Sequence, residues 1–178
     1  MGDNRQRRKT VRALLEPCSE ATLITTSIAR PLGASLKRVN VSISGAAGSP
    51  MEAARVRTRL YLHDIMRAMQ LLVEAYGLQR IGIVTPSHTL PTNAVPQFAD
   101  IKLADPEPYN VRPIEVILWA DIYNQLVLPG IIQRDGNVAP CTIFGWILTG
   151  SISYQGPALT LAAVHCTTTT LELPNTVY

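Results

Sequence analysis

The sequence predicts a single β-rich domain with one or two short helices. Its 178 residues suit one domain, and a hydrophobic content of 47% is enough to fill a core. Aromatic residues make up only 6%, whereas Val, Ile, Leu and Thr are plentiful and there are 13 prolines. That balance favours short β-branched strands separated by prolines over a helical bundle.

The first part of the chain predicts strands joined by short turns. "VRALL" (11–15) is typical of a buried strand, and "EPCS" (16–19) forms its turn. Thr25 or Thr26 can cap one helical turn that ends before Pro31 and Gly33. In "RVNVSISG" apolar and polar residues alternate, which predicts a half-buried strand, and "SGAAGS" has the composition of a hairpin tip.

The segment from Pro50 to Tyr76 supports two interpretations. Apolar residues recur there at helical spacing, and Pro50 suits a first helical turn. Arg55, Arg57 and Arg59, however, alternate with small or apolar residues, which is typical of a strand. The local pattern alone leaves both structures open.

The second part of the chain begins with a predicted loop. Six prolines, at 86, 91, 96, 106, 108 and 113, interrupt any long regular element between Ile81 and Pro113. "IEVILWADIYNQLVL" then predicts a five-residue strand and a short helix that starts near Ala120 or Asp121. "CTIFGWILTGSISY" and "ALTLAAVHCTTTTLEL" predict the final strands.

The net charge of +3 comes largely from a basic cluster in the first dozen residues: Arg5, Arg7, Arg8, Lys9 and Arg12. Such a cluster can meet phosphates. No aromatic platform or nucleic-acid motif accompanies it, so we expect a solvated end or a hairpin turn and do not expect nucleic acid as a partner.

The cysteines and the apolar runs restrict the other function classes. Cys18, Cys141 and Cys166 lie far apart, which favours reduced thiols, and they lack metal-ligand spacing. We therefore expect neither metal nor cofactor. No apolar run reaches the ~20 residues that span a bilayer, and the amino terminus lacks the apolar core of a secretory signal. An intracellular, cytoplasmic protein without a membrane segment is expected.

Five segments in order carry a resemblance to the retropepsin-like aspartic peptidase domain of Pao and Bel type retrotransposons. "VRALLEPCSEATLIT" looks like that family's strand, catalytic Asp-Ser-Gly turn and following run, and "RVNVSISGAAGS" looks like its flap. The others are "LADPE", "IEVILWADIYNQLVLPG" and "TIFGWILTG". The resemblance predicts a basic segment at 1–10, a peptidase-like domain at 11–150 and a C-terminal strand extension at 151–178.

The resemblance implies an all-β acid-protease barrel that is half of an enzyme. Such peptidases are symmetric homodimers in which each chain supplies one Asp, and the two carboxylates share a proton. The flap, here Ser44, Gly45, Ala46, Ala47 and Gly48, closes over a peptide or polyprotein segment.

The resemblance also bears on two uncertain parts of the chain. It favours strands at 51–62 and 70–76. The family's first strand is expected to be absent, which leaves an unpaired sheet edge.

The catalytic turn departs from the family at each position. Glu16 occupies the place of the Asp, and its extra methylene displaces the carboxylate by about an ångström, which can cost on the order of 100-fold in rate. Pro17 replaces the Ser or Thr whose hydroxyl ties the two turns together, and Cys18 replaces a Gly that admits close approach. Trp119 stands where the family has Gly after "VIL", so local packing must differ.

Two hypotheses of function follow. The first is a catalytically impaired or inactive descendant that acts as a dimerisation or peptide-binding module. The alternative is an active aspartic endopeptidase for polyprotein processing, with Glu16 in a homodimeric carboxylate dyad. The sequence alone is compatible with an enzyme and with an inactive protein.

Overall fold

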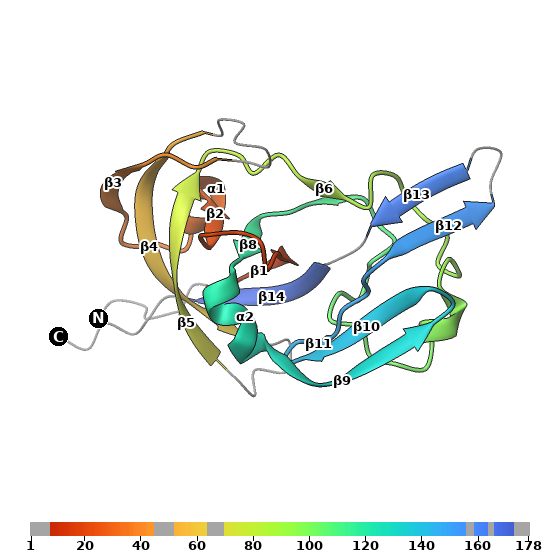
Figure 1. Cartoon of the computed structure of the whole chain (residues 1–178). Coiled ribbons are helices and arrows are strands. Elements are labelled where there is room, and N and C mark those ends of the chain that lie inside the picture. The colour runs from red at the N-terminus through yellow and green to blue at the C-terminus, as the bar shows by residue number, and fades with distance from the viewer. Residues whose placement is uncertain (1–7, 45–51, 64–69, 156–158, 164–165, 173–178) are drawn as a thin grey trace.

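A computed structural model describes residues 8–44, 52–63, 70–155, 159–163 and 166–172, with side chains described up to Gly150. The protein is mostly β, with two short α-helices (Figure 1), which confirms the predicted fold class at that level. The helices are α1 (Thr26–Ala29), α2 (Ala120–Leu126) and the 3-10 helix η2 (Pro96–Phe98). The strands are β1 (Arg8–Leu15), β2 (Leu23–Thr25), β3 (Lys37–Val41), β4 (Ala54–His63), β5 (Gln70–Leu78), β6 (Val84–Thr85), β7 (Arg112–Pro113), β8 (Val116–Leu118), β9 (Val127–Arg134), β10 (Asn137–Thr142), β11 (Gly145–Trp146), β12 (Ser151–Gln155), β13 (Leu159–Ala163) and β14 (Cys166–Glu172).

Seven strands form the main sheet, in the order β14-β1-β8-β2-β5-β4-β3. Strand β14 pairs antiparallel with β1 from Arg8↔Glu172 to Leu14↔Cys166, and it also pairs with β4. The prediction of an unpaired edge beside β1 is therefore wrong, because the end of the chain returns to cover it. Because β14 pairs with both β1 and β4, it connects the second strand of the sheet order with the second-to-last.

Strands β4 and β5 settle the ambiguity between helix and strand. They pair antiparallel from Val56↔Gly77 to His63↔Gln70, so the preference for strands is confirmed at 54–62 and at 70–76. Alternate side chains of both strands are buried in the main core, including Leu60, Leu62 and Val73. A period of two fits this one-sided burial, whereas a helix would spread the arginines of β4 around its axis.

The main core lies between the curved sheet and the two short helices (Figure 1). Helix α1 contributes Ile28 and Ala29, and helix α2 contributes Ile122 and Leu126. Both helices lie where the sequence predicts them. Their apolar faces pack on the sheet because helices this short gain most of their stability from tertiary contacts.

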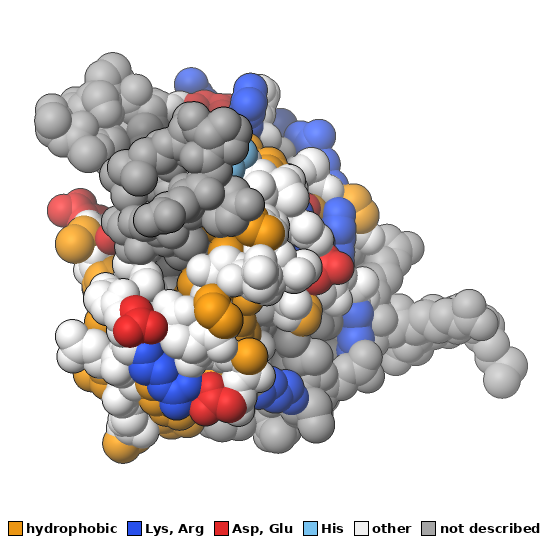
Figure 2. Space-filling model, turned by 90° about the vertical axis from the view of Figure 1, so that its right-hand side faces the viewer, with side chains coloured by type: hydrophobic (Ala, Val, Ile, Leu, Met, Phe, Trp, Pro, Cys, Tyr) orange, Lys and Arg blue, Asp and Glu red, His pale blue; other side chains and the backbone are white. Residues whose placement is uncertain are grey.

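Smaller sheets form the other end of the molecule: β11-β10-β9, β12-β13 and β6-β7. Beneath the first, Phe98 and Leu148 belong to a separate buried cluster. Arg134 pairs with Asp100 and lies 5.8 Å from the centre of the Phe98 ring, and its hydrogen bond lowers the pKa of Asp100. Figure 2 shows acidic and basic groups side by side on this face, among scattered hydrophobic side chains.

Arg12 ties β1 to the proline-rich segment. Its guanidinium is 1% exposed and lies 2.7 Å from Asp105 Oδ2, which is also buried. Nη1 donates to the carbonyl oxygens of Thr85 (2.6 Å) and Asn110 (2.8 Å), and Nη2 donates to that of Glu107 (2.7 Å). The expectation of a solvated basic cluster is therefore wrong for Arg12. Within the described part of that cluster, Arg8 is exposed.

The glycine of "TIFGWILTG" at 145 holds the residues just before Asp105. Gly145 has φ +116°, and a Cβ there would lie 3.1 Å from Lys102 O and 3.2 Å from Ala104 N. The neighbouring Trp146 exchanges backbone hydrogen bonds with this segment, donating to Lys102 O and accepting from Ala104 N–H. Only glycine fits both the conformation and the space.

Replacing Arg12 by Leu tests the importance of the buried pair. The change leaves the Asp105 carboxylate buried without its cation and removes the donor to three carbonyls, so we expect a loss of about 3–5 kcal/mol in the free energy of unfolding. Urea denaturation measures it. Arg12→Leu with Asp105→Leu should recover part of the loss. The exposed Arg30→Leu is the control and should change stability by no more than ~0.5 kcal/mol; equal losses at 12 and 30 would contradict the assignment.

Candidate functional site

The turn that begins at Glu16 is placed by three strands. Strand β8 lies between β1, with which it is parallel (Leu15↔Leu118), and β2, with which it is antiparallel (Leu23↔Ile117). The chain from 16 to 22 therefore connects two strands that flank a third. The backbone N–H of Glu16 donates to Leu118 O at 3.1 Å, which fixes the start of the turn against the end of β8.

The Glu16 carboxylate is bound within its own turn. The Cys18 backbone N–H donates to Glu16 Oε1 at 3.1 Å, and the Ser19 N–H donates to the Glu16 carbonyl oxygen at 3.1 Å. Glu16 is partly exposed, whereas Pro17 and Cys18 are exposed. The predicted site residues thus lie together at the surface of a single chain, at the end of β1.

Trp119 directly follows β8 and begins helix α2 as its N-cap residue. Its backbone N–H donates to the Oγ1 of the buried Thr22 at 3.3 Å. The indole is half-buried. Strand β8 passes between β1 and β2 directly before Trp119, so an indole at this position is compatible with the crossing.

The predicted flap lies mostly outside the described residues. Ser44 is exposed, and Gly45, Ala46, Ala47 and Gly48 lie outside the described part of the chain. Strands β3 and β4, on either side of this segment in the sequence, pair antiparallel at Lys37↔Arg57. The flap itself stays a prediction.

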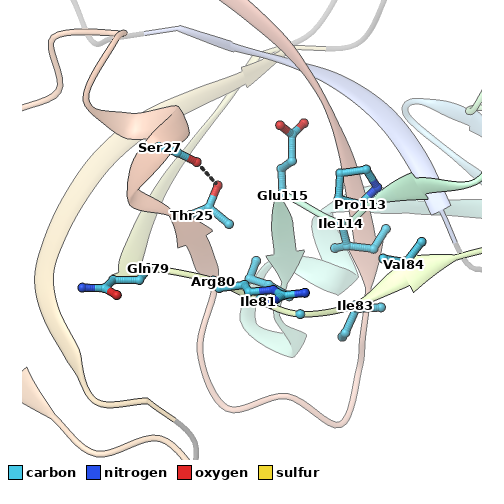
Figure 3. A pocket seen from close by; sticks show the side chains of 11 residues that line it. Thr25, Ser27, Gln79, Arg80, Ile81, Ile83, Val84, Pro113, Ile114 and Glu115 are labelled. Atoms are coloured by element: carbon cyan, nitrogen blue, oxygen red, sulfur yellow. Dashed lines mark hydrogen bonds between the residues drawn. The ribbon is translucent and has the colours of Figure 1, made fainter.

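A shallow pocket of about 220 Å³ lies at the start of β8 (Figure 3). It does not include the Glu16 turn, which adjoins the other end of β8. Three strand residues at ~3.3 Å each separate the two ends by roughly 10 Å. Polar and apolar side chains from segments far apart in the sequence line it, among them Thr25, Ser27, Arg80, Ile81, Ile83 and Glu115.

Glu115 is the acidic group of this pocket, and no sequence motif marks it. Figure 3 shows its carboxylate extending away from the 80–83 segment that crosses in front of β8. The Ser27 hydroxyl donates to Thr25 Oγ1 at 3.3 Å on the same wall. A single acid outside any motif can be recognised as a candidate site residue only after the fold has placed it in a pocket.

The cysteines whose side chains the structure describes form neither a disulfide nor a metal site. Cys18 is exposed and Cys141 is half-buried, both as free thiols, and Cys166 pairs with Leu14 at backbone level. Among the described residues, no three His, Cys, Asp or Glu side chains are grouped so that they could bind a metal. In the same part of the chain, no helix has the length and apolarity to cross a bilayer.

No family model, curated protein or solved structure matches the chain.

Replacing Glu16 by Ala tests how the turn is held. The change removes the exposed hydrogen bond from Cys18 N–H to Glu16 Oε1 and keeps the backbone hydrogen bonds of the turn, so we expect the free energy of unfolding to change by no more than ~0.5 kcal/mol. Thr22→Val, which deprives the Trp119 N–H of its acceptor at a buried position, should cost about 1–3 kcal/mol. Thermal and urea unfolding of both variants measure the contrast, and a larger loss in Glu16→Ala than in Thr22→Val would contradict it.

Proposed function

We propose that the chain is a retrotransposon-derived, retropepsin-like aspartic-peptidase domain of the Pao and Bel type that is catalytically impaired or inactive. It acts as a dimerisation or peptide-binding module. One observation carries the proposal: β8 passes between β1 and β2 directly behind the turn that holds Glu16. This is where the family resemblance puts the strand "VIL" relative to the catalytic turn.

Two further placements support the peptidase-like architecture. The short helix after "VIL" is present as α2, and the segment "LADPE" supplies the Asp105 that pairs with Arg12. Two of the segments that carry the resemblance, one containing Arg12 and the other Asp105, are therefore in direct contact as well as in the expected order along the chain.

The chemistry of the turn favours the impaired form. A dyad needs two carboxylates a few ångströms apart that share a proton. The Glu16 carboxylate instead accepts a hydrogen bond from Cys18 N–H inside its own turn. Pro17 offers neither a hydroxyl nor an N–H to a partner turn, and the Cys18 Cβ occupies space that the family's Gly leaves open.

The peptide-binding role rests on the surface beside β8. Exposed apolar side chains, Ile83, Val84 and Val111, lie on or near the segment that borders the pocket. An extended peptide can place alternate side chains in a shallow depression that is bordered by apolar groups and lined by both polar and apolar side chains. The position of Glu16 at the surface leaves it accessible to a second copy of the chain.

Restoring the family's turn tests the proposal directly. The triple variant Glu16→Asp, Pro17→Ser, Cys18→Gly should cleave members of a diverse peptide library between pH 3 and 7 and bind a statine-type transition-state analogue, whereas the natural sequence does neither. The matched control is Glu16→Asn with the same changes at 17 and 18. A restored variant that is folded and dimeric but inert would overturn the peptidase-like assignment. Sedimentation velocity supplies the oligomeric state of each protein.

The alternative, an active endopeptidase, is favoured by the retained carboxylate. It predicts cleavage by the natural sequence and complete loss in Glu16→Gln, a variant that preserves the size of the side chain. The library assay distinguishes the two functions, because the impaired form predicts identical blank results for the natural sequence and Glu16→Gln.

A further inference from the structure

The outer face of strands β3 and β4 carries a row of basic side chains. Arg55, Arg57 and Arg59 are two residues apart, so they project from the same side of β4. Lys37 of β3 is the register partner of Arg57 and joins them on that side. We call these four residues the basic face.

The positive charge of this face is only partly compensated. Glu74 of β5 binds Arg57 at 3.0 Å and Arg59 at 3.3 Å, and Arg55 donates to the Asn40 side chain, which is neutral. The side chains of Arg57 and Arg59 remain 42% and 69% exposed. By register, Glu172 lies at the far end, opposite Tyr61. The interspersed charges on the face in Figure 2 contrast with this run of like charge.

Two tyrosines border the arginines. Tyr76 of β5 is the register partner of Arg57, and Tyr61 follows Arg59 on the same side of β4. Both residues are half-buried, so each is held in place while part of its surface stays accessible. The pairing of β4 with β5 therefore brings together cations and aromatic groups that lie far apart in the sequence.

We propose that the basic face binds single-stranded nucleic acid, with phosphates on the arginines and bases on the tyrosines. Cations every two residues recur at about 6.7 Å along an extended strand, a linear array that suits a linear polyanion. The sequence argued against nucleic acid at the amino terminus because no aromatic platform was present there. On this face the platform is supplied by strand pairing.

Other anionic partners fit this surface less well. An acidic peptide would match the charge and leave the tyrosines unused. A bilayer would need several exposed apolar side chains, and of the large aliphatic residues described on this side only Leu72, 46% exposed, is strongly accessible. The inference goes beyond the proposed function and uses no residue of the Glu16 turn.

The test is binding of the full chain to fluorescein-labelled 20-nucleotide oligo(dT) and oligo(U), followed by anisotropy at several salt concentrations. Four phosphate contacts predict a slope of log K against log salt of roughly −2.8. In Arg55→Gln/Arg59→Gln the slope should fall in size by about 1.4 and affinity at low salt should drop by about tenfold. Arg30→Gln/Arg80→Gln removes two exposed arginines elsewhere and should bind within about twofold of the natural protein.

Two more variants separate binding from loss of structure. Glu74→Gln removes the competing carboxylate and should tighten binding several-fold, a gain that a damaged fold would not give. Tyr61→Leu should weaken binding about fivefold or more while leaving the salt slope unchanged, because stacking releases no counterion.

Three results would each overturn the proposal. One is an equal loss of binding in the control pair. Another is equal affinity for poly-glutamate or for phosphatidylserine vesicles, which would assign the face to an acidic peptide or a membrane. The third is the absence of salt-dependent binding at protein concentrations up to about 100 µM, the weak limit of non-specific nucleic-acid binding.

Discussion

The buried contact between Arg12 and Asp105 is the interaction on which the rest of the structure depends. Strand β1 lies between β14 and β8, and the proline-rich segment that precedes β8 has little regular structure to satisfy its own carbonyl groups. One guanidinium does this for Thr85, Glu107 and Asn110 while facing a carboxylate. The five donors of arginine, fixed in one plane, suit such a task, whereas lysine would offer a single point of contact. These contacts hold the proline-rich segment in place, so the chain continues through Ile114 into β8 in register with β1.

The sequence predicts β4 and β5 because one-sided burial imposes a local period of two, but it does not predict β9, and β8 has three residues where five were expected. Arg55, Arg57 and Arg59 alternate with residues whose side chains face the core, as expected for a strand with one buried face. The helical spacing of apolar residues in the same segment does not correspond to a helix. Pairings between distant strands leave no comparable local trace. The return of β14 to β1 was therefore missed, and so was Arg12, since a basic residue among others in the sequence gives no sign that its own side chain points inward.

The candidate site shows the same division. The position of Glu16 at the end of a buried strand follows from the pattern, since an apolar run must end where the chain turns into solvent. The direction of its carboxylate does not follow, because it depends on a backbone N–H two residues later and on side-chain torsions. The pocket beside Glu115 was unpredictable for a different reason. Its walls come from the end of β2, helix α1 and the segments 79–84 and 113–115, which meet only after the whole sheet has formed.

Architecture and chemistry are separable at the Glu16 turn. The turn is held by backbone bonds, from Glu16 N–H to Leu118 O and from Ser19 N–H to Glu16 O, and neither depends on the identity of the side chains at 16, 17 or 18. The longer side chain of Glu can reach back to Cys18 N–H, the first donor after a proline that has none. Substitution at 16, 17 or 18 can therefore change the chemistry of the turn while the crossing of β8 behind it is kept. In the proposed assignment, the crossing of β8 therefore bears on the architecture, and only the side chains of the turn bear on catalysis.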